Sequence, residues 1–569
     1  MKDATHLGTL FLAMRRLRAP LITLICIYAV SVLGLTLVPG TDGARMSFFH
    51  AFYFISYTAT TIGFGEIPAT FSEPQRLWVL VCIYLAVVGW AYTLGSMFAL
   101  MQDTTFRDAV NAERFSRGVR RLQEPFFLVC GYGETGRLVC RSLDRMGARS
   151  VVLETQLQRA GEVELHNHLA DIPVLQADAS NPAHLRMAGL GHPWCRGVLA
   201  LTNDDSANLA IAISSRLLAP STPALCRAES AETAANMASF GTEHIINPYE
   251  KFAEYLAQAL HAPNAYHLLT WLTGQPGTTV ERHRDPPRGK WVLCGYGEFG
   301  RILVEAFDRE AVPVTIIDRE PTEKDGHRHV RGDGTGAAIL ERANITQAAG
   351  ICATTGDDMD NLSIVMTARE LNPELFVIVR MNHYTNHELF EAFGADVTVV
   401  PSQIIANECL AVLTTPLLAP FLDQIHTRDD AWAARLLERL TERFGWDAPL
   451  VWSVRINLSE APALYRCLMM EEAPLRLGEI LRSPHDRNQP LDAEPLYLFR
   501  DDGEHLIDPP PDTLIRAGDE LLMVGRRGAR HAFSLTIDNM HTLAYVLSGA
   551  EMPGGLVWEW LARRRRGAA

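Results

Sequence analysis

The sequence predicts a membrane α-helical unit with two transmembrane helices, followed by a cytoplasmic α/β region of two tandem Rossmann-like domains and a small α+β C-terminal lobe. Two observations predict this fold class. Two long uncharged runs, 21–38 and 77–101, lie near the start of the chain. A glycine-rich strand-to-helix motif then occurs twice, 164 residues apart. At 569 residues the chain has room for several such units.

The two uncharged runs are each long enough to cross a membrane as one helix. The segment 47–60 between them is short and rich in aromatic residues, so we expect a re-entrant helix that leads into residues 61–65. Non-helical backbone at membrane depth is tolerated only where protein buries it or where it lines a water-filled cavity. The sequence therefore predicts that several copies of 20–101 meet around a pore.

Residues 61–65 carry the strongest motif, Thr61-Ile62-Gly63-Phe64-Gly65. It resembles the Thr-Val-Gly-Tyr-Gly selectivity filter of two-transmembrane potassium channels, whose backbone carbonyls replace the water shell of K⁺. Glycine lets the backbone turn successive carbonyls toward one axis without a Cβ clash. The resemblance implies K⁺ in the filter and a homotetramer in the lipid bilayer of a bacterial inner membrane.

Two further residues of this unit are candidates for function. Glu66 follows the filter where the family usually has Asp; it either holds the outer end of the filter by hydrogen bonding or is a solvated carboxylate that attracts cations. Gly89 lies mid-span at the expected position of a gating hinge, with Gly95 as the nearby alternative. Glycines in membrane helices also serve close packing, which is the other interpretation.

The positive charges predict the orientation. Arginines precede the first span in 1–19 and follow the second in the linker 102–121, while the connecting loop carries only Arg45 and Arg76. By the positive-inside rule both termini are cytoplasmic. The net charge of −14 argues against nucleic-acid binding. Ten scattered cysteines without a Cys-x-x-Cys pair predict buried thiols rather than a zinc site.

The cytoplasmic part is an internal repeat. Residues 126–137 return as 290–301, and 197–208 return as 350–361. Each copy reads as an apolar strand, a Gly-x-Gly-x-x-Gly loop, a helix and a second strand that ends in an acid, Glu154 or Asp318. In dinucleotide-binding folds these glycines permit a tight turn and close approach of a pyrophosphate, and the acid accepts hydrogen bonds from the ribose. We expect tandem domains over 122–280 and 288–430.

The repeats resemble the RCK domain, also called TrkA-N or KTN, which regulates potassium channels and transporters. The segments 176–179 and 331–334, and 203–208 and 356–361, carry this resemblance, and 514–522 resembles the end of a TrkA-C lobe, expected over 445–530. It implies a ring of eight RCK domains from four subunits that pulls on the inner helices. The implied nucleotide-binding residues are Gly131, Gly133, Glu134, Thr135, Gly136, Arg137, Glu154, Asp178 and Asn203 in the first copy, and Gly295, Gly297, Glu298, Phe299, Gly300, Arg301, Asp318, Asp333 and Thr355 in the second.

The ligand implied for these clefts is NAD(H) or an adenine nucleotide (ADP, ATP or AMP), because an acid favours an unphosphorylated ribose. The alternative is that one or both clefts are structural. Asp204, Asp205, Asp357, Asp358 and Asp360 form either divalent-cation sites or helix N-caps. The tail 540–569, with Trp558, Trp560 and Arg563–Arg566, either touches an anionic bilayer or is a solvated basic tail.

These inferences predict a potassium-selective channel gated by a ligand of its RCK domains, and not an enzyme. Two alternatives remain at this point. A membrane-anchored NAD-dependent oxidoreductase explains the glycine loops but not the filter motif. A regulatory subunit that gates a separate potassium transporter needs no filter of its own.

Overall fold

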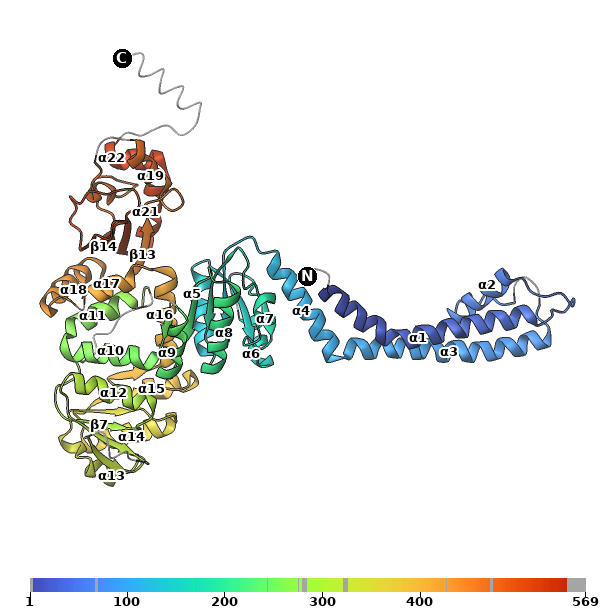
Figure 1. Ribbon diagram of the computed structural model, residues 1–569, viewed down its shortest axis with the longest axis horizontal. Coiled ribbons are helices and arrows are strands. Elements are labelled where there is room, and N and C mark those ends of the chain that lie inside the picture. Colours follow the sequence, from blue (N-terminus) through green and yellow to red (C-terminus); the bar gives the residue numbers. More distant parts are fainter. Residues whose placement is uncertain are drawn as a thin grey trace, which may run out of the picture. The chain divides into compact units, whose positions relative to one another are not determined.

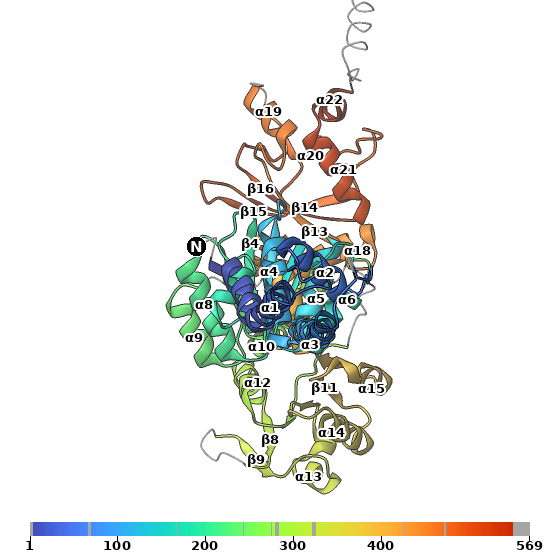
Figure 2. The same cartoon turned by 90° about the vertical axis from the view of Figure 1, so that its right-hand side faces the viewer.

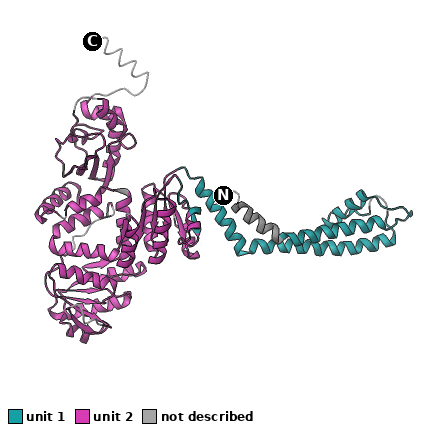
Figure 3. Ribbon diagram, in the orientation of Figure 1, with its two compact units in different colours: residues 1–123, 173–175, 186–192 teal, residues 124–172, 176–185, 193–569 magenta. Residues whose placement is uncertain are grey.

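The computed structural model describes residues 4–66, 70–166, 168–242, 244–274, 276–278, 284–320, 326–425, 427–470 and 474–549, without the side chains of 4–16 and 414. The basic end of the expected tail, including Arg563–Arg566, lies outside these residues. The chain divides into two compact units, one of 1–123 with 173–175 and 186–192, the other of the remaining residues (Figure 3). The predicted fold class is confirmed.

The first unit is built on two long helices that lie side by side (Figure 1). Its elements are α1 (Ala4–Leu37), α2 (Phe48–Ala59), α3 (Glu73–Gln102) and α4 (Thr104–Arg120). Among the described residues, two single helical stretches are long and apolar enough to cross a membrane, Leu17–Leu37 and Glu73–Gln102, with mean hydropathies of 2.2 and 2.1.

Two helix starts differ from the expected bounds. α1 begins at Ala4, inside the stretch expected to precede the first span, because 1–19 contains no residue that stops a helix outright. α3 begins four residues before the expected position 77, where Ser72 and Gln75 form a capping box that satisfies the first free N–H groups.

The core of the first unit lies where α2 meets α1 and α3. Leu35, Phe54, Tyr57, Phe71 and Cys82 are buried there. The outward faces of the two long helices remain apolar and exposed, with Ile25, Val88 and Phe98 among the most accessible side chains. An apolar surface of this kind requires lipid or another subunit to cover it.

The second unit contains two parallel sheets with the same strand order. The first sheet runs β3-β2-β1-β4-β5-β6 and the second β9-β8-β7-β10-β11-β12. The strands are β1 (Phe126–Cys130), β2 (Arg149–Glu154), β3 (Val174–Gln176), β4 (Cys195–Ala200), β5 (Ala224–Arg227), β6 (His244–Ile246), β7 (Trp291–Cys294), β8 (Val314–Asp318), β9 (Arg328–Arg331), β10 (Gly350–Ala353), β11 (Phe376–Arg380) and β12 (Val397–Val399). This is the doubly wound order of dinucleotide-binding domains.

The helices of this unit follow the strands in both repeats. They are α5 (Glu134–Arg145), α6 (Leu157–Leu165), α7 (Pro182–Met187), α8 (Asp205–Leu218), α9 (Ala231–Ser239), α10 (Pro248–His261), α11 (Pro263–Thr273), α12 (Glu298–Arg309), α13 (Ala337–Arg342), α14 (Asp358–Leu371), α15 (His387–Phe393), α16 (Pro401–Thr414), α17 (Leu418–Ile425) and α18 (Asp430–Phe444). Two short 3₁₀ turns, Ile345–Gln347 and Tyr384–Asn386, complete the second repeat.

Both faces of the second sheet are buried. Leu293 and Ile316 pack with α12 on one face, while Val292 and Ile317 pack with α13 and α14 on the other (Figures 1 and 2). Consecutive residues of one strand therefore enter different cores, as the alternation of side chains along a strand requires. Nine of the ten cysteines are buried and all ten are free, which confirms their expected role as apolar core residues.

The two repeats exchange helices. α10 follows the first sheet in sequence but packs against α12 of the second repeat, while α16 follows the second sheet but packs against α5 of the first. The Tyr255 hydroxyl of α10 donates a hydrogen bond to Glu408 of α16. These residues occupy the same position in the two copies, 153 residues apart. The pair therefore lies on a pseudo-twofold axis, as between subunits of a symmetric dimer.

The C-terminal lobe is an antiparallel sheet in the order β13-β16-β14-β15 with helices on it. Leu496 and Tyr497 on one face of the sheet pack on α11, α17 and α18. The lobe extends past the expected end at 530, because Phe533, Ile537 and Leu543 of two further helices complete its other core. Its elements are β13 (Leu450–Arg455), α19 (Pro462–Met470), α20 (Leu477–Ile480), β14 (Ala493–Phe499), β15 (His505–Ile507), β16 (Glu520–Gly525), α21 (Arg527–Asp538) and α22 (Met540–Ser548).

By length and composition alone, the pair α16 and α17, bent by 112°, would also pass as a broken span. Phe421 and Ile425 of α17 are buried in the core shared with the C-terminal lobe. We therefore assign this pair to the soluble fold.

Candidate functional site: the filter loop and the glycine-loop clefts

The backbone of residues 61–65 alternates in handedness. Thr61, Gly63 and Gly65 have φ of 66°, 65° and 89°, whereas Ile62 and Phe64 do not have positive φ. Such alternation turns successive carbonyls toward one side of the chain, and glycine adopts positive φ at little cost. Positive φ at Thr61 is unfavourable for a residue with a Cβ, so surrounding contacts have to hold it.

Those contacts come from Tyr57 in the last turn of α2. Its carbonyl accepts hydrogen bonds from the N–H of Ile62 at 2.9 Å and of Gly63 at 3.3 Å. Its hydroxyl donates to the Gly65 carbonyl. The Tyr57 ring also contacts the Phe64 ring edge to face, with centroids 5.4 Å apart. One buried residue therefore holds both ends of the loop, the first through its backbone carbonyl and the second through its side chain.

Glu66 is bound rather than free. One oxygen accepts a hydrogen bond from the Arg76 Nε at 2.8 Å, and the other accepts from the Phe71 N–H at 2.9 Å. The bond from Arg76, and then that from Phe71, lowers the pKa of the Glu66 carboxyl. These bonds tie Glu66 to the segment that leads into α3, and its role in holding the outer end of the loop stays a prediction.

Gly89 lies in an unbroken helix in this structure. A Cβ added there would stand 2.7 Å from the Ile27 Cδ1 of α1, while one at Gly95 meets nothing within 4 Å. Gly89 therefore serves close packing of the two long helices here, which favours the packing interpretation over the hinge in this conformation.

The first repeat contains a cleft of about 440 Å³ at the carboxyl ends of its strands. Its lining includes Gly131, Gly133, Leu153, Glu154, Thr155, Gln156, Arg159, Ala177, Asp178, Ala179, Ser180, Leu201, Thr202, Asn203, Asp204 and Ala207. Five of the nine residues proposed for this copy from the sequence are therefore brought together: Gly131, Gly133, Glu154, Asp178 and Asn203. Ligands of doubly wound sheets bind at this edge.

The glycines shape the floor of the cleft. Gly131 has φ of 97°, and a Cβ there would stand 3.1 Å from the Thr202 backbone. At Gly136 a Cβ would stand 2.0 Å from the Gly131 carbonyl oxygen, so only glycine lets α5 pack this closely. Gly133 is the N-cap residue of α5 and provides no side-chain cap, which leaves the first N–H groups of that helix open to an anion.

The acid that ends β2 is tied to the glycine loop. Glu154 is buried; one oxygen accepts from the Tyr132 N–H at 2.6 Å and the other from the Gln156 N–H at 2.9 Å. Asp318 repeats this arrangement, accepting from the Tyr296 N–H at 2.7 Å and the Glu320 N–H at 2.9 Å. A carboxylate oxygen can accept more than one hydrogen bond, so these acids can still receive a ribose hydroxyl.

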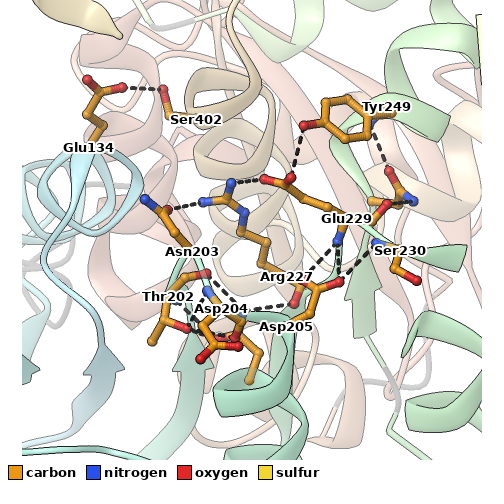
Figure 4. Close-up of polar contacts among 12 residues, drawn as sticks. Glu134, Thr202, Asn203, Asp204, Asp205, Arg227, Glu229, Ser230, Tyr249 and Ser402 are labelled. Carbon is orange, nitrogen blue, oxygen red and sulfur yellow. Dashed lines mark hydrogen bonds and ion pairs between the residues drawn. The ribbon is translucent and has the colours of Figure 1, made fainter. Parts of the chain in front are cut away.

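Four side chains proposed from the sequence do not contribute to a cleft, which is a correction. Glu134 turns to the second repeat, where it accepts from the Ser402 hydroxyl at 3.3 Å (Figure 4). It also accepts from the Tyr384 N–H at 2.8 Å. Thr135, in the first turn of α5, is buried, and Arg137 is exposed outside the cleft lining. Phe299 is 1% exposed and belongs to the core. The first turn of a helix points its side chains in several directions, which sequence spacing alone does not resolve.

The second repeat has an ion pair at two positions whose counterparts in the first repeat line the cleft. Arg319 Nη2 lies 3.2 Å from Asp360 Oδ2. The equivalent positions in the first repeat are Thr155 and Ala207, which both line its cleft. The ion pair thus spans the place where the first cleft is open. Asp333 and Thr355 keep the hydrogen bonds of their counterparts, to Thr335 and Asn361.

Two of the acidic residues at the strand-to-helix turns, Asp204 and Asp357, act as helix N-caps. Asp204 accepts from the N–H groups of Ser206 and Ala207, and Asp357 does the same for Met359 and Asp360. Over the described ranges no group of three or more His, Cys, Asp or Glu side chains is placed to hold a metal ion. The geometry therefore favours the N-cap interpretation of these residues.

Two features of the site were missed by sequence reasoning. Arg159 of α6 is the only Lys or Arg among the residues that line the first cleft, and a Cβ on Gly133 would stand 3.7 Å from its Nη1. Arg227 reaches from the end of β5 to the Asn203 side chain, with a hydrogen bond of 2.6 Å. Arg227 recurs as Arg380, 153 residues later, but the sequence pattern does not indicate its partner.

Comparison with known proteins agrees with this architecture. A family model described as "Ion channel" matches residues 21–105, and one described as "TrkA-N domain" matches 127–248 and 291–401. The chain thus joins an ion-channel domain to two TrkA-N domains. The ion-channel domain and the two apolar helices make it a membrane protein.

Several relatives of this chain are potassium channel proteins. It is 27% identical over 160 residues to "Potassium channel protein 1" of Methanocaldococcus jannaschii, which covers 27% of this chain and 48% of the relative. It is 31% identical over 140 residues to "Probable potassium channel protein 2" of the same organism, covering 23% and 41%. It is 23% identical over 212 residues to "Voltage-gated potassium channel Kch" of Escherichia coli, covering 37% and 49%. The matches span about half the length of these relatives or less.

Among solved structures, "GsuK channel bound to NAD" has 18% identity and a TM-score of 0.44, covering 93% of this chain and 100% of that one. "Crystal structure of the GsuK bound to ADP" has 20% identity and a TM-score of 0.43, covering 71% and 99%.

Proposed function

We propose that this chain is one subunit of a potassium-selective channel whose opening is controlled by a nucleotide bound to its TrkA-N domains. The observation that carries the proposal is the loop Thr61–Gly65, whose alternating φ turns backbone carbonyls to one side and whose ends are held by Tyr57. Carbonyl rings of this kind replace the hydration shell of K⁺. Relatives named as potassium channels support the same function.

The channel is a homotetramer, because one loop supplies only a quarter of a ring of carbonyls. Ile62 and Phe64 are each 59% exposed in the single chain, and neighbouring subunits would cover this surface. Four chains would bring eight TrkA-N domains into a cytoplasmic ring. Both termini face the cytoplasm of a bacterial inner membrane, since the flanking segments carry more arginine than the loop between the spans.

The regulatory ligand is NAD(H) or an adenine nucleotide in the first cleft. Glu154 favours an unphosphorylated ribose. The phosphates lie between the uncapped start of α5 and the Arg159 guanidinium, which has no ion-pair or hydrogen-bond partner within the described parts of the chain. Without Arg159 the charged lining would consist of Glu154, Asp178 and Asp204 alone, and would repel a phosphate.

The cleft controls the pore by shifting a conformational equilibrium. A nucleotide favours the open state only if it binds the open ring more tightly than the closed one. The segment 102–121, helical as α4, is the covalent link through which a change in the TrkA-N domains reaches α3. The cleft acts as a regulatory site, and the proposal assigns no chemical reaction to it.

The experiment is planar-bilayer recording of the purified full-length protein under opposed K⁺ and Na⁺ gradients, with NAD⁺, NADH and ADP added in turn to the cytoplasmic face. Potassium-selective openings whose probability changes with one nucleotide are expected. If the openings are potassium-selective but their probability changes with none of the three nucleotides, the proposed pore is supported and the proposed control by a nucleotide is rejected. No current under any condition would favour a regulatory subunit, and substrate-linked NADH turnover would favour an anchored oxidoreductase.

A further inference from the structure

A line of polar contacts runs from the first cleft to the second repeat. Asn203, in the cleft lining, accepts a hydrogen bond from Arg227, whose other amine contacts Glu229. The Tyr249 hydroxyl donates to the second Glu229 oxygen at 3.0 Å and accepts from Arg380 Nη2 at 2.8 Å. Figure 4 shows Asn203, Arg227, Glu229 and Tyr249 in this succession. We call these five residues the relay.

The far end of the relay lies on the second glycine loop. The Arg380 guanidinium stands 4.9 Å from the centroid of the Tyr249 ring and 5.8 Å from that of Phe299. The Tyr249 and Phe299 rings stack with centroids 5.0 Å apart. Phe299 lies between Gly297 and Gly300, so a shift of this loop acts on the ring that holds Arg380.

Burial makes the relay sensitive to small movements. Arg227 is 8% exposed, Tyr249 3% and Phe299 1%. Hydrogen bonds between buried groups are strong, and a donor or acceptor left unpaired there is costly. Burial raises the pKa of Tyr249 to about 12, so its hydroxyl stays protonated and donates at neutral pH. A displaced Tyr249 would therefore leave the second Glu229 oxygen and Arg380 Nη2 without the hydrogen bonds that the Tyr249 hydroxyl makes to them, while the other Glu229 oxygen keeps its contact with Arg227.

The fold alone does not require the relay, because the two repeats differ here. Arg227 and Arg380 occupy equivalent positions at the ends of β5 and β11, yet Arg227 faces its own cleft while Arg380 faces α10 of the first repeat. The counterpart of Glu229 is Asn382, and that of Tyr249 is Ser402. The relay thus occurs only once among the described residues, between the first cleft and the second repeat.

We infer that Arg227, Tyr249 and Arg380 are positioning residues that set the Asn203 side chain in the first cleft according to the packing of the second repeat. The inference rests on the proposed nucleotide site. It states how binding of a nucleotide in the first cleft affects the second repeat. A nucleotide that contacts Asn203 is coupled to the second glycine loop, and the coupling is reciprocal.

The test changes the end of the relay that lies outside the cleft. Binding of ADP to the full-length protein in detergent is measured by calorimetry for Arg380→Gln and for the control Arg369→Gln. Arg369 is a matched control because, like Arg380, it stacks on an aromatic ring, that of Phe393. Its ion-pair partner, Asp396, lies within the second repeat. Arg380→Gln should weaken ADP binding about three- to tenfold, as for residues of one hydrogen-bond network, and Arg369→Gln should not. Arg380→Lys, which keeps charge and donor, should restore most of the affinity.

A second readout does not depend on any ligand. Hydrogen exchange of the Leu201–Asp204 turn in the ligand-free protein should rise in Arg380→Gln and stay at the wild-type level in Arg369→Gln. Equal exchange at this turn in both variants would overturn the relay. Wild-type protein that binds no ADP, NAD⁺ or NADH would instead reject the nucleotide site, while the exchange result would still decide whether the relay exists.

Discussion

At the scale of single residues, Arg159 decides whether the first cleft accepts phosphate. Arg159→Gln removes the only cationic side chain of the lining. A hydrogen bond to a charged group is worth about 1.5–3 kcal/mol, so ADP affinity should fall roughly 10- to 100-fold. Adenosine affinity should change little, because adenosine has no phosphate. Titration calorimetry with both ligands measures the two effects.

Arg137→Gln is the control for this prediction. Arg137 follows the same glycine loop in sequence but lies outside the lining of the cleft. Its replacement should leave ADP binding unchanged. A larger loss of ADP affinity in Arg137→Gln than in Arg159→Gln would mean that Arg137, the residue proposed from the sequence motif, binds the phosphate instead.

Glu66 gives the filter loop a pH dependence. Because its folded pKa is lowered below the ordinary value of 4.5, its ion pair with Arg76 stabilises the loop above that pH. The contribution is lost as the external pH falls through the lowered pKa. Potassium current should therefore decline at strongly acidic external pH. Glu66→Gln should have reduced current already at neutral pH and lack this acidic transition; an identical transition in both proteins would assign it to another group.

At the scale of elements, the start of α5 depends on Gly136. A Cβ there would overlap the Gly131 carbonyl, so Gly136→Ala forces the helix away from the strand. We expect a loss of about 1–3 kcal/mol in the free energy of unfolding. Gly161 of α6 is the matched control, because a Cβ there meets nothing within 4 Å.

Gly161→Ala should stabilise α6 by up to about 1 kcal/mol through helix propensity. Thermal unfolding of the full-length protein in detergent, followed by circular dichroism, measures both variants. The two substitutions add the same methyl group to a glycine in a helix. Equal shifts of the unfolding temperature would mean that close packing at Gly136 is not what makes glycine necessary.

At the scale of the whole molecule, the pairing of the two repeats depends on contacts at their pseudo-twofold axis. Glu408→Leu would leave the half-buried Tyr255 hydroxyl without this acceptor, at a cost of about 1 kcal/mol. The double variant Tyr255→Phe/Glu408→Leu removes both polar groups and should recover part of this loss. Thermal unfolding compares them, and a double variant less stable than Glu408→Leu would contradict the axis contact.

The asymmetry of this pair also bears on assembly. Two second repeats placed about the same axis would bring two Glu408 carboxylates together, which is unfavourable, whereas the first and second repeats bring Tyr255 to Glu408. The contact therefore favours pairing of unlike repeats. This is compatible with both repeats lying in one chain.

Much of the architecture followed from local sequence patterns. Uncharged runs of 18 or more residues predict spans, because an apolar helix of that length matches the thickness of the hydrocarbon core of a bilayer. Two glycine motifs in register predict two doubly wound domains, because the tight turn and close packing at Gly131 and Gly136 exclude other residues. The filter motif predicts the backbone conformation of residues 61–65, because positive φ at alternate residues costs little only where those residues are glycine.

The sequence by itself thus determined the order of the units, the repeat and the glycine, acid and filter positions, all of which depend on neighbours close in the chain. Only the tertiary structure decided which side chains enter the first cleft: it brought in Arg159 and turned Glu134 to Ser402. It also joined Asn203 to Arg380 through Tyr249. These contacts join residues up to 268 positions apart, and their geometry depends on the exchange of α10 and α16, which no local pattern encodes.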